Sequence, residues 1–288
     1  MGPMLVGYAD QTGRVNENVI KYYEARAKGG AGLIIVEACC VDVPTGKEGA
    51  GQIHIDNADC IPGLTSLART IKKYDCKAFV QLFHAGRQTS SQITGVPPVA
   101  PTRKGLTPSR EVPRELSYSE IKNLINQFIK AADYAYQAGF DGVELHAAHG
   151  YLLNEFLSPK MNTRQDEYGG SLQNRMRILL EIIAGIKLQH PSLAISVRLN
   201  IDDFIPGGLQ PEQSVLIAQE LEKHGANLIN CSCGTYESGL TSIEPASYPE
   251  GWRVYLAEKV KQRVQIPVVT GGMIYNPDFA DKVIAEGR

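Results

Sequence analysis

The chain has 288 residues, of which 43% are hydrophobic and 21% are charged, and its formal net charge is −2. This composition supports a sizeable core and excludes an intrinsically disordered chain. The small net charge gives no basis for binding nucleic acid or an acidic membrane surface. No secretory n-region and h-region follows Met1, and no apolar run is long enough to span a bilayer, so we expect a cytoplasmic protein.

The chain contains six cysteines, and none of them forms a Cys-x-x-Cys pair. In a chain of this size we expect them to be reduced residues of the core or of strands in a cytosolic protein, not a disulfide framework.

Short apolar runs alternate with amphipathic stretches along the chain. The runs predict strands at Leu33–Val36, Ala78–Phe83, Gly142–Leu145, Ala194–Leu199, Leu228–Ser232 and Pro267–Thr270. The amphipathic stretches predict helices at Glu17–Lys28, Gly63–Tyr74, Tyr118–Ala138, Gln173–Gln189, Glu212–His224, Trp252–Arg263 and Asp278–Glu286. Ser117 and Glu120 have the spacing of a capping box at the start of the third helix. The strand–helix repeat predicts a parallel sheet, and the number of units favours a TIM (β/α)₈ barrel over an open doubly wound sheet.

Both ends of the chain depart from this repeat. Residues 1–4 have the pattern of the end of a strand whose beginning is missing, and no strand follows the last helix. A closed barrel needs both edges. We therefore expect residues 1–288 to form a single barrel domain that is truncated at both ends, although an open sheet that is complete as it stands is the alternative.

One long connection interrupts the rhythm between residues 86 and 116. It is rich in Pro, Gly and Ser, and it contains the run Pro97–Pro101. A connection of this length that follows a strand is typical of a lid or a binding loop, so we predict a lid-like insertion at about 87–116. A disordered insertion is the alternative.

Three polar aromatic residues follow the predicted strand Gly142–Leu145, namely His146, His149 and Tyr151. In a parallel barrel this end of the strand carries the chemistry. Two N–H donors and a phenolic proton suit a reaction in which an oxygen gains negative charge and a nearby carbon gains a proton. A metal site is the alternative for the His-x-x-His pair, but no third ligand has suitable spacing, so we predict no metal.

Six segments of the sequence, one of which contains the two histidines and Tyr151, form a recognisable series along the chain. They are Gly2–Met4, Tyr22–Glu37, Gln81–Arg87, His146–Tyr151 continuing through Asn162–Ser171, Ser196–Asn200 and Thr270–Gly272. Together they resemble the old yellow enzyme family, the FMN-dependent ene-reductases and NADH:flavin oxidoreductases, along essentially the whole chain. The resemblance implies a TIM barrel with FMN at the C-terminal ends of the strands. It also implies that NADH or NADPH reduces the flavin, which then reduces an activated C=C bond conjugated to a carbonyl.

The resemblance assigns roles to the residues after the third predicted strand. His146 and His149 resemble the pair that donates hydrogen bonds to the substrate carbonyl oxygen, which gains charge as hydride reaches the β-carbon. Tyr151 resembles the proton donor to the α-carbon, because a phenol stays protonated at neutral pH.

The resemblance also assigns flavin contacts. Gln81 resembles the amide that pairs with the pyrimidine edge of the flavin, and Arg198 resembles the cation beside its N1 and C2 carbonyl. The remaining implied contacts are the backbones of Pro3, Met4 and Ala38 at the ring and Gly271 and Gly272 as half of the phosphate cradle. The sequence departs from the family at Leu5, where Thr or Cys often tunes the flavin, so the flavin potential is not carried over.

Two other functions stay open at this stage. One is a flavin-free barrel lyase or isomerase, which needs a Schiff-base lysine or a metal at a strand end, and neither is found. The other is a truncated, non-catalytic barrel. An iron–sulfur cluster is expected only if the protein extends beyond Arg288. The identity of the small unsaturated carbonyl substrate, the choice between NADH and NADPH, and the formation of a homo-oligomer stay open.

Overall fold

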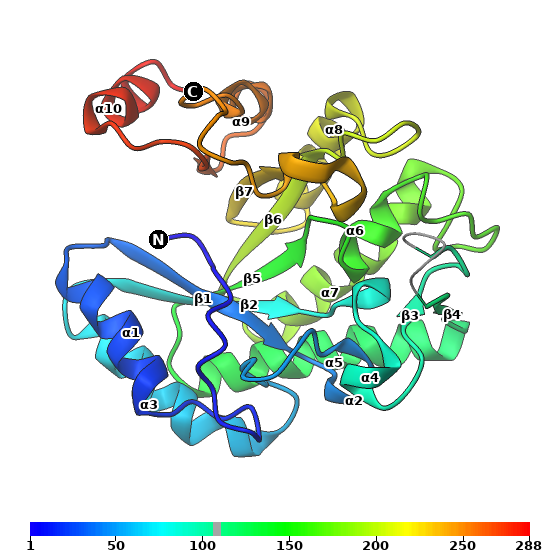
Figure 1. The fold of residues 1–288 in the computed structure, drawn as a ribbon, viewed down its shortest axis with the longest axis horizontal. Helices are drawn as coiled ribbons and strands as arrows, with labels where there is room; N and C mark the ends of the chain where they lie inside the picture. Colours follow the sequence, from blue (N-terminus) through cyan, green and yellow to red (C-terminus); the bar gives the residue numbers. More distant parts are fainter. Residues whose placement is uncertain (106–110) are drawn as a thin grey trace.

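The computed structural model describes residues 1–105 and 111–288, and a parallel sheet forms its centre (Figure 1). The six strands of this sheet lie in the order β1-β2-β5-β6-β7-β8. Their bounds are β1 Leu33–Cys40, β2 Lys77–Phe83, β5 Gly142–Ala147, β6 Ala194–Asp202, β7 Leu228–Cys233 and β8 Val268–Val269. A doubly wound sheet reverses its strand order at a switch point. Here the order of the strands in the sheet follows their order along the chain and never reverses. This is the order of a TIM barrel, as predicted.

The six predicted strands are all present, although only β2 ends at the predicted residue. β1 runs four residues beyond Val36 and β6 runs to Asp202, whereas β8 is limited to two residues. The extensions lie at the end of the sheet where the polar residues of the site are located. The N-terminal residue also pairs with this sheet, because the Met1 amino group donates to the Leu33 carbonyl oxygen (2.5 Å) and the Ile35 N–H donates to the Met1 carbonyl oxygen (3.1 Å).

The seven predicted helices are present with small shifts at their ends. They are α1 Glu17–Lys28, α3 Ile61–Lys72, α5 Tyr118–Gln137, α7 Leu172–Gln189, α8 Pro211–Lys223, α9 Val254–Lys261 and α10 Pro277–Ala285. The Ser117–Glu120 capping box is confirmed at the start of α5. α3 begins two residues earlier than predicted because Pro62 is accepted in the first turn of a helix.

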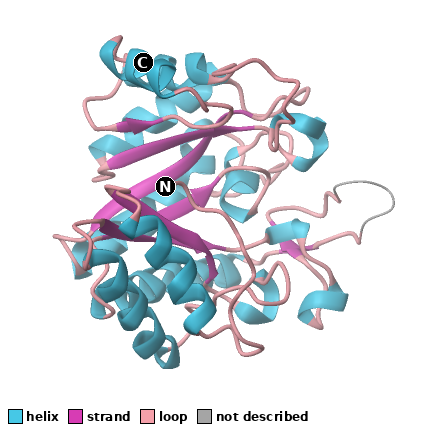
Figure 2. Cartoon of the chain, turned by 60° about the vertical axis from the view of Figure 1, so that its left-hand side comes forward, coloured by secondary structure: helices cyan, strands magenta, loops and turns pink. Residues whose placement is uncertain are grey.

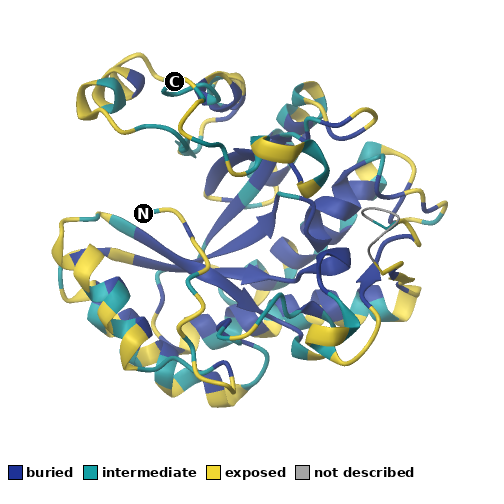
Figure 3. Cartoon of the chain, viewed as in Figure 1, coloured by how far each residue is buried: buried dark blue, intermediate teal, exposed yellow. Residues whose placement is uncertain are grey.

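The helices form the outer layer of the fold (Figure 2). Along the series α1, α3, α5, α7, α8 and α9, each helix contacts the next. The strands that they cover are almost entirely buried (Figure 3), and the core lies between the two layers. The six cysteines are free and buried, as predicted.

Short elements that no pattern in the sequence predicts follow the ends of the strands. They are α2 Val43–Gly46 after β1, η2 Gly86–Gln88 and α4 Ser91–Thr94 after β2, α6 Leu152–Leu157 after β5, and η3 Tyr236–Thr241 after β7, while η1 Ala58–Cys60 precedes α3. None has the length that a periodic pattern needs to be read from sequence.

The predicted lid segment contains η2, α4 and a small two-stranded sheet of β3 Val99–Ala100 and β4 Arg114–Glu115, and its residues 106–110 lie outside the described residues. The side chain of the buried Arg164 holds two points of this segment, because it donates hydrogen bonds to the carbonyl oxygens of Pro101 (2.9 Å) and Leu116 (2.7 Å). The segment is therefore anchored to the barrel at its C-terminal part. Its role as a lid stays a prediction.

Candidate active site

The structure brings together the three residues that were predicted to carry the chemistry. The ring centroid of His146 lies 5.2 Å from that of His149 and 4.9 Å from that of Tyr151. Phe83, at the end of β2, packs against Tyr151 with a centroid separation of 4.6 Å. His146 lies in β5, and Tyr151 is the residue that precedes α6, so one strand-to-helix connection places all three rings at the C-terminal edge of the sheet.

A backbone turn at His149 makes this cluster. His149 has a φ of 62° and Gly150 a φ of 78°, so two successive residues adopt the left-handed region. Such a conformation is unfavourable for a residue with a Cβ. Two hydrogen bonds hold it: the His149 N–H donates to Asn200 Oδ1 (3.2 Å), and Gln88 Nε2 donates to the His149 carbonyl oxygen (2.8 Å).

Both histidines are neutral imidazoles. Burial lowers the pKa of His146 and of His149 well below the usual value, and the positive charge of Arg198 lowers it further. The Ala148 N–H donates to His146 Nδ1 (3.4 Å), and His149 Nε2 lies 2.6 Å from Ser232 Oγ. These contacts use one nitrogen of each ring, so the other nitrogen of each ring is the one that can act on a ligand.

Tyr151 contacts the carboxyl group of Glu48, a residue that no motif in the sequence indicates. Its phenol donates a hydrogen bond to Glu48 Oε1 at 2.6 Å, and its ring packs in a small apolar cluster with Ala38, Phe83 and Ala85. Burial raises the pKa of Tyr151, and the neighbouring Glu48 raises it further. The phenol is therefore fully protonated at neutral pH.

The sheet register aligns two rows of polar residues below the histidines. Gln81, Glu144 and Ser196 are aligned on β2, β5 and β6. His146 is aligned with Arg198, two residues further along. Because alternate residues of a strand share a face, both rows lie on the same face of the sheet.

Glu144 is the centre of these rows, and it was not among the predicted site residues. It is fully buried, and it accepts hydrogen bonds from Ser196 Oγ (2.7 Å), Gln81 Nε2 (2.8 Å) and Asn230 Nδ2 (3.0 Å). Three donors around one carboxyl group match a carboxylate, which can only accept. Burial raises the pKa of Glu144, whereas the charge of Arg198 and the three donors lower it. A charged residue within a strand buried on both faces was the sequence signal that could have identified it.

Arg198 is held near the N-terminal segment. Its Nη1 donates to the Pro3 carbonyl oxygen (3.4 Å), while its buried Nε has no hydrogen-bond partner among the described residues. Burial lowers the pKa of Arg198, and the charge of Glu144 opposes this effect. Pro3 is buried, whereas the side chain of Met4 is 62% exposed.

The two glycines after β8 lie beside a second arginine, Arg253, which no motif in the sequence indicates. Arg253 Nε donates to the Gly271 carbonyl oxygen (2.7 Å), and Arg253 Nη2 lies 3.4 Å from Glu244 Oε1. Gly272 has a φ of 94°, a backbone conformation that favours glycine, and the end of the Arg253 side chain lies over this position.

These residues fit FMN, by the chemistry of the donors present. Arg198 offers a buried N–H without a partner, and Gln81 is oriented by Glu144 with its carbonyl and its second N–H available. Gly271 and Gly272 meet the Arg253 cation in a closely packed turn, which suits a phosphate. Among the described residues, no group of three or more His, Cys, Asp and Glu side chains is placed to hold a metal ion.

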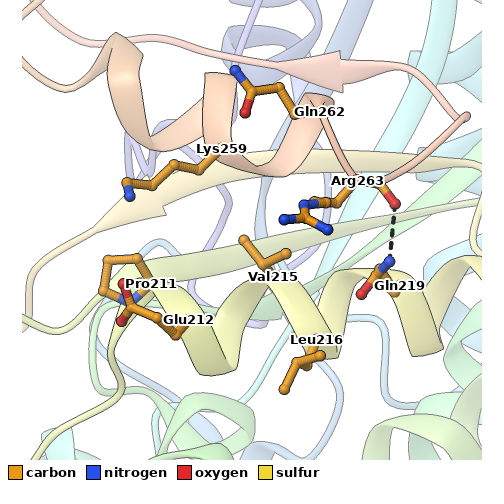
Figure 4. Close-up of a pocket in the computed structure, with 8 residues that line it drawn as sticks. All are labelled: Pro211, Glu212, Val215, Leu216, Gln219, Lys259, Gln262 and Arg263. Carbon is orange, nitrogen blue, oxygen red and sulfur yellow. Dashed lines mark hydrogen bonds between the residues drawn. The ribbon is translucent and has the colours of Figure 1, made fainter.

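A separate groove lies on the outer layer, between α8 and α9 (Figure 4). Its volume is about 380 Å³, and it is lined by Pro211, Glu212, Val215, Leu216, Gln219, Lys259, Gln262 and Arg263. None of these residues belongs to the strand ends that carry the histidines, so the groove is not part of the candidate site. None of the helices in residues 1–105 and 111–288 combines the length and the apolar character that crossing a bilayer requires.

The family model of the NADH:flavin oxidoreductase / NADH oxidase family matches residues 1–288. The NADH oxidase of Thermoanaerobacter brockii is 47% identical over 290 residues, which cover the whole chain but 44% of that relative. The NADPH dehydrogenase of Clostridium acetobutylicum is 35% identical, and the match covers the whole chain and 83% of that protein.

Two solved structures show the same fold. A 2-naphthoyl-CoA reductase in complex with 2-naphthoyl-CoA has a TM-score of 0.94 at 31% identity over 99% of this chain and 46% of that chain. The old yellow enzyme homologue from Zymomonas mobilis has a TM-score of 0.84 at 28% identity, and the match covers the whole chain and 81% of that chain. The chain thus spans less than half the length of some relatives and most of the length of others.

The fold and these relatives define the class of TIM-barrel flavin oxidoreductases. The chain belongs to the NADH:flavin oxidoreductase / NADH oxidase family, the old yellow enzyme family that its motifs resemble.

Proposed function

We propose that this chain is an FMN-dependent oxidoreductase that passes hydride from NADH or NADPH to the activated C=C bond of an unsaturated carbonyl compound. The observation that carries the proposal is the cluster of His146, His149 and Tyr151, whose ring centroids lie within 6.4 Å of one another at the strand ends of a barrel of this family. FMN, when bound, would supply the hydride-transfer chemistry between the nicotinamide and the substrate.

Several groups of the chain would hold the flavin. The backbones of Pro3, Met4 and Ala38 would contact the ring. Gln81 would pair with the pyrimidine edge, and the permanent charge of Arg198 would favour added electrons on the flavin. Gly271 and Gly272 would bind the phosphate through backbone N–H groups, and the positive charge of Arg253 would attract it.

The histidines act on the substrate carbonyl oxygen. Because both imidazoles are neutral, each carries a single N–H. His146 presents Nε2–H, since its Nδ1 accepts from the Ala148 N–H, and His149 presents Nδ1–H in the tautomer in which Ser232 Oγ donates to its Nε2. These two donors stabilise the negative charge that develops on the oxygen. Neutral donors suit this role, since two adjacent imidazolium ions near Arg198 would repel one another. Tyr151 then gives its phenolic proton to the α-carbon, which completes the reduction.

Replacing Tyr151 by Phe tests this proposal, because it removes the proton donor and keeps the ring. With anaerobic stopped-flow spectroscopy of the FMN-loaded chain, we expect substrate reduction to slow about 10²–10⁴-fold, while flavin reduction by NADH or NADPH changes by about twofold or less. The control is Tyr275→Phe, since Tyr275 is 71% exposed and lies outside the cluster. Unchanged rates of both half-reactions in the Tyr151→Phe variant would show that the assigned role is wrong.

A further inference from the structure

Glu48 lies where loops that follow three different strands meet. It belongs to the loop after β1 and α2, and its Oε1 accepts hydrogen bonds from the phenols of Tyr151, after β5, at 2.6 Å and of Tyr236, after β7, at 3.4 Å. In the sequence, Glu48 is separated from Tyr151 by 103 positions and from Tyr236 by 188 positions. No motif in the sequence marks this meeting.

The loop that carries Glu48 is held in place on both sides. The Glu48 N–H donates to Gln52 Oε1 (2.8 Å), and Gln52 Nε2 donates to the Ala38 carbonyl oxygen (3.0 Å) in β1. On the other side, Thr89 Oγ1 donates to the Lys47 carbonyl oxygen (2.6 Å). The carboxyl group is therefore positioned by the fold beside Tyr151, rather than reaching it from a free surface loop.

Proton transfer from Tyr151 creates an electrostatic problem at this position. Loss of the phenolic proton would leave a phenolate 2.6 Å from Glu48, and an ionised Glu48 would then face a second negative charge at hydrogen-bond distance. A protonated Glu48 removes this problem. Once the phenol of Tyr151 turns its O–H toward the substrate, the direction of the 2.6 Å hydrogen bond reverses, and Glu48 can supply a proton to Tyr151 as the phenolic proton leaves. Burial raises the pKa of Glu48, while the hydrogen bonds from Tyr151 and Tyr236 lower it.

We propose that protonated Glu48 is the positioning residue that replaces the proton given up by Tyr151, an inference that rests on the proposed function. The O–H bond of Tyr151 breaks as the C–H bond forms at the substrate α-carbon. The O–H bond of the Glu48 carboxyl group breaks as a new O–H bond forms on Tyr151. Glu48, left as a carboxylate, is then reprotonated by a hydronium ion of the bulk solvent, which supplies the one proton that the reduction consumes; its partly exposed position permits this.

The test compares Glu48→Gln with the unmodified chain, both loaded with FMN. Gln preserves the shape and the acceptor for Tyr151, but it has no acidic proton. We expect alkene reduction to slow about 10–100-fold, with flavin reduction by the nicotinamide unchanged within about twofold. The protonated form of Glu48 is lost as the pH rises, so the rate of alkene reduction should fall through its raised pKa in the unmodified chain, and this dependence should be absent in Glu48→Gln.

The groups that face Glu48 are the phenols of Tyr151 and Tyr236 and the uncharged amide of Gln52, and Lys47 is its neighbour in the chain. The phenols of Tyr151 and Tyr236 are protonated in the resting chain, so their titration does not produce the expected fall of the alkene-reduction rate with rising pH. A slower rate with an unchanged pH profile would show that Glu48 only maintains structure, and would overturn the inference.

A second measurement does not depend on turnover. In the ¹³C NMR titration of labelled Glu side chains, the Glu48 carboxyl resonance should titrate above the usual pKa of Glu, and its pKa should rise further in Tyr151→Phe, which removes a hydrogen bond that lowers it. Titration of Glu48 at the usual value, about 4.3, would overturn the inference.

The outcomes separate the two proposals. If the unmodified chain reduces no alkene, the proposed function is wrong and the role of Glu48 in it is wrong as well. If the unmodified chain is active and Glu48→Gln is equally active with the same pH profile, the proposed function stands and only the inference is overturned.

Discussion

Replacing Glu144 by Gln should weaken the folded barrel, because this carboxylate anchors polar residues on three neighbouring strands. It accepts one hydrogen bond each from Gln81, Ser196 and Asn230, and it is fully buried. Its negative charge also offsets the charge of Arg198 in the same region. Gln keeps the volume of the side chain and removes the charge.

The expected loss follows from the partners left behind. Removing one member of a buried charge pair costs about 3–5 kcal/mol, because the other charge stays buried without compensation. Gln retains one oxygen that can accept two of the three donors, but its NH₂ group must face the third donor. We therefore expect the free energy of unfolding to fall by about 2–4 kcal/mol. Affinity for FMN should fall as well, since Gln81 loses the group that orients it and Arg198 loses the opposite charge of Glu144.

Urea unfolding, followed by far-UV circular dichroism and by the fluorescence of the single tryptophan, Trp252, measures this loss. The matched control is Glu17→Gln, because Glu17 forms only an exposed pair with Lys21 on α1, and its midpoint should equal that of the unmodified chain. A Glu144→Gln midpoint equal to that of Glu17→Gln would refute the view that a charged, fully bonded carboxylate occupies the centre of the sheet.

Three further predictions test neighbouring parts of the site. Burial raises the pKa of Glu155 to about 8, so the native chain keeps a proton that the unfolded chain loses near pH 4.5, and the free energy of unfolding should fall as the pH rises between these values. Glu155→Gln should remove this slope in urea unfolding at several pH values, and a slope that persists contradicts the assignment. Arg253→Ala should weaken binding of FMN about 10-fold or more and leave binding of riboflavin, which lacks the phosphate, unchanged; equal losses for both ligands, measured by quenching of flavin fluorescence, would argue against phosphate contact. Ser232→Ala should remove the partner of His149 Nε2, lowering the rate of substrate reduction about 10-fold with flavin reduction unaffected, and an equal rate in stopped-flow experiments would show that Ser232 does not orient the ring.

The secondary structure could be predicted because its signals are local. The six strands and seven long helices follow from periodicity, and the start of α5 follows from Ser117 and Glu120. Short elements such as α6 could not be predicted, because six residues do not establish a period, and their conformation depends on the strand ends against which they pack.

The short spacing of the candidate catalytic residues in the sequence allowed their prediction, whereas the carboxyl groups that interact with the site could not be predicted in this way. The proximity of His146, His149 and Tyr151 in sequence made them visible together. Glu48 and Glu144 meet their partners only through the sheet register and the loops above it, across separations of 52 to 188 residues.

By itself, then, the sequence determined the alternation of strands and helices, the family, and the three aromatic residues at the end of β5. Each of these depends on the identity and spacing of residues that are close together in the chain. Only the tertiary structure decided which carboxyl groups lie beside them. Burial and distance, which arise when remote segments pack, set the pKa values of His146, His149 and Glu48, and no local pattern in the chain contains that information.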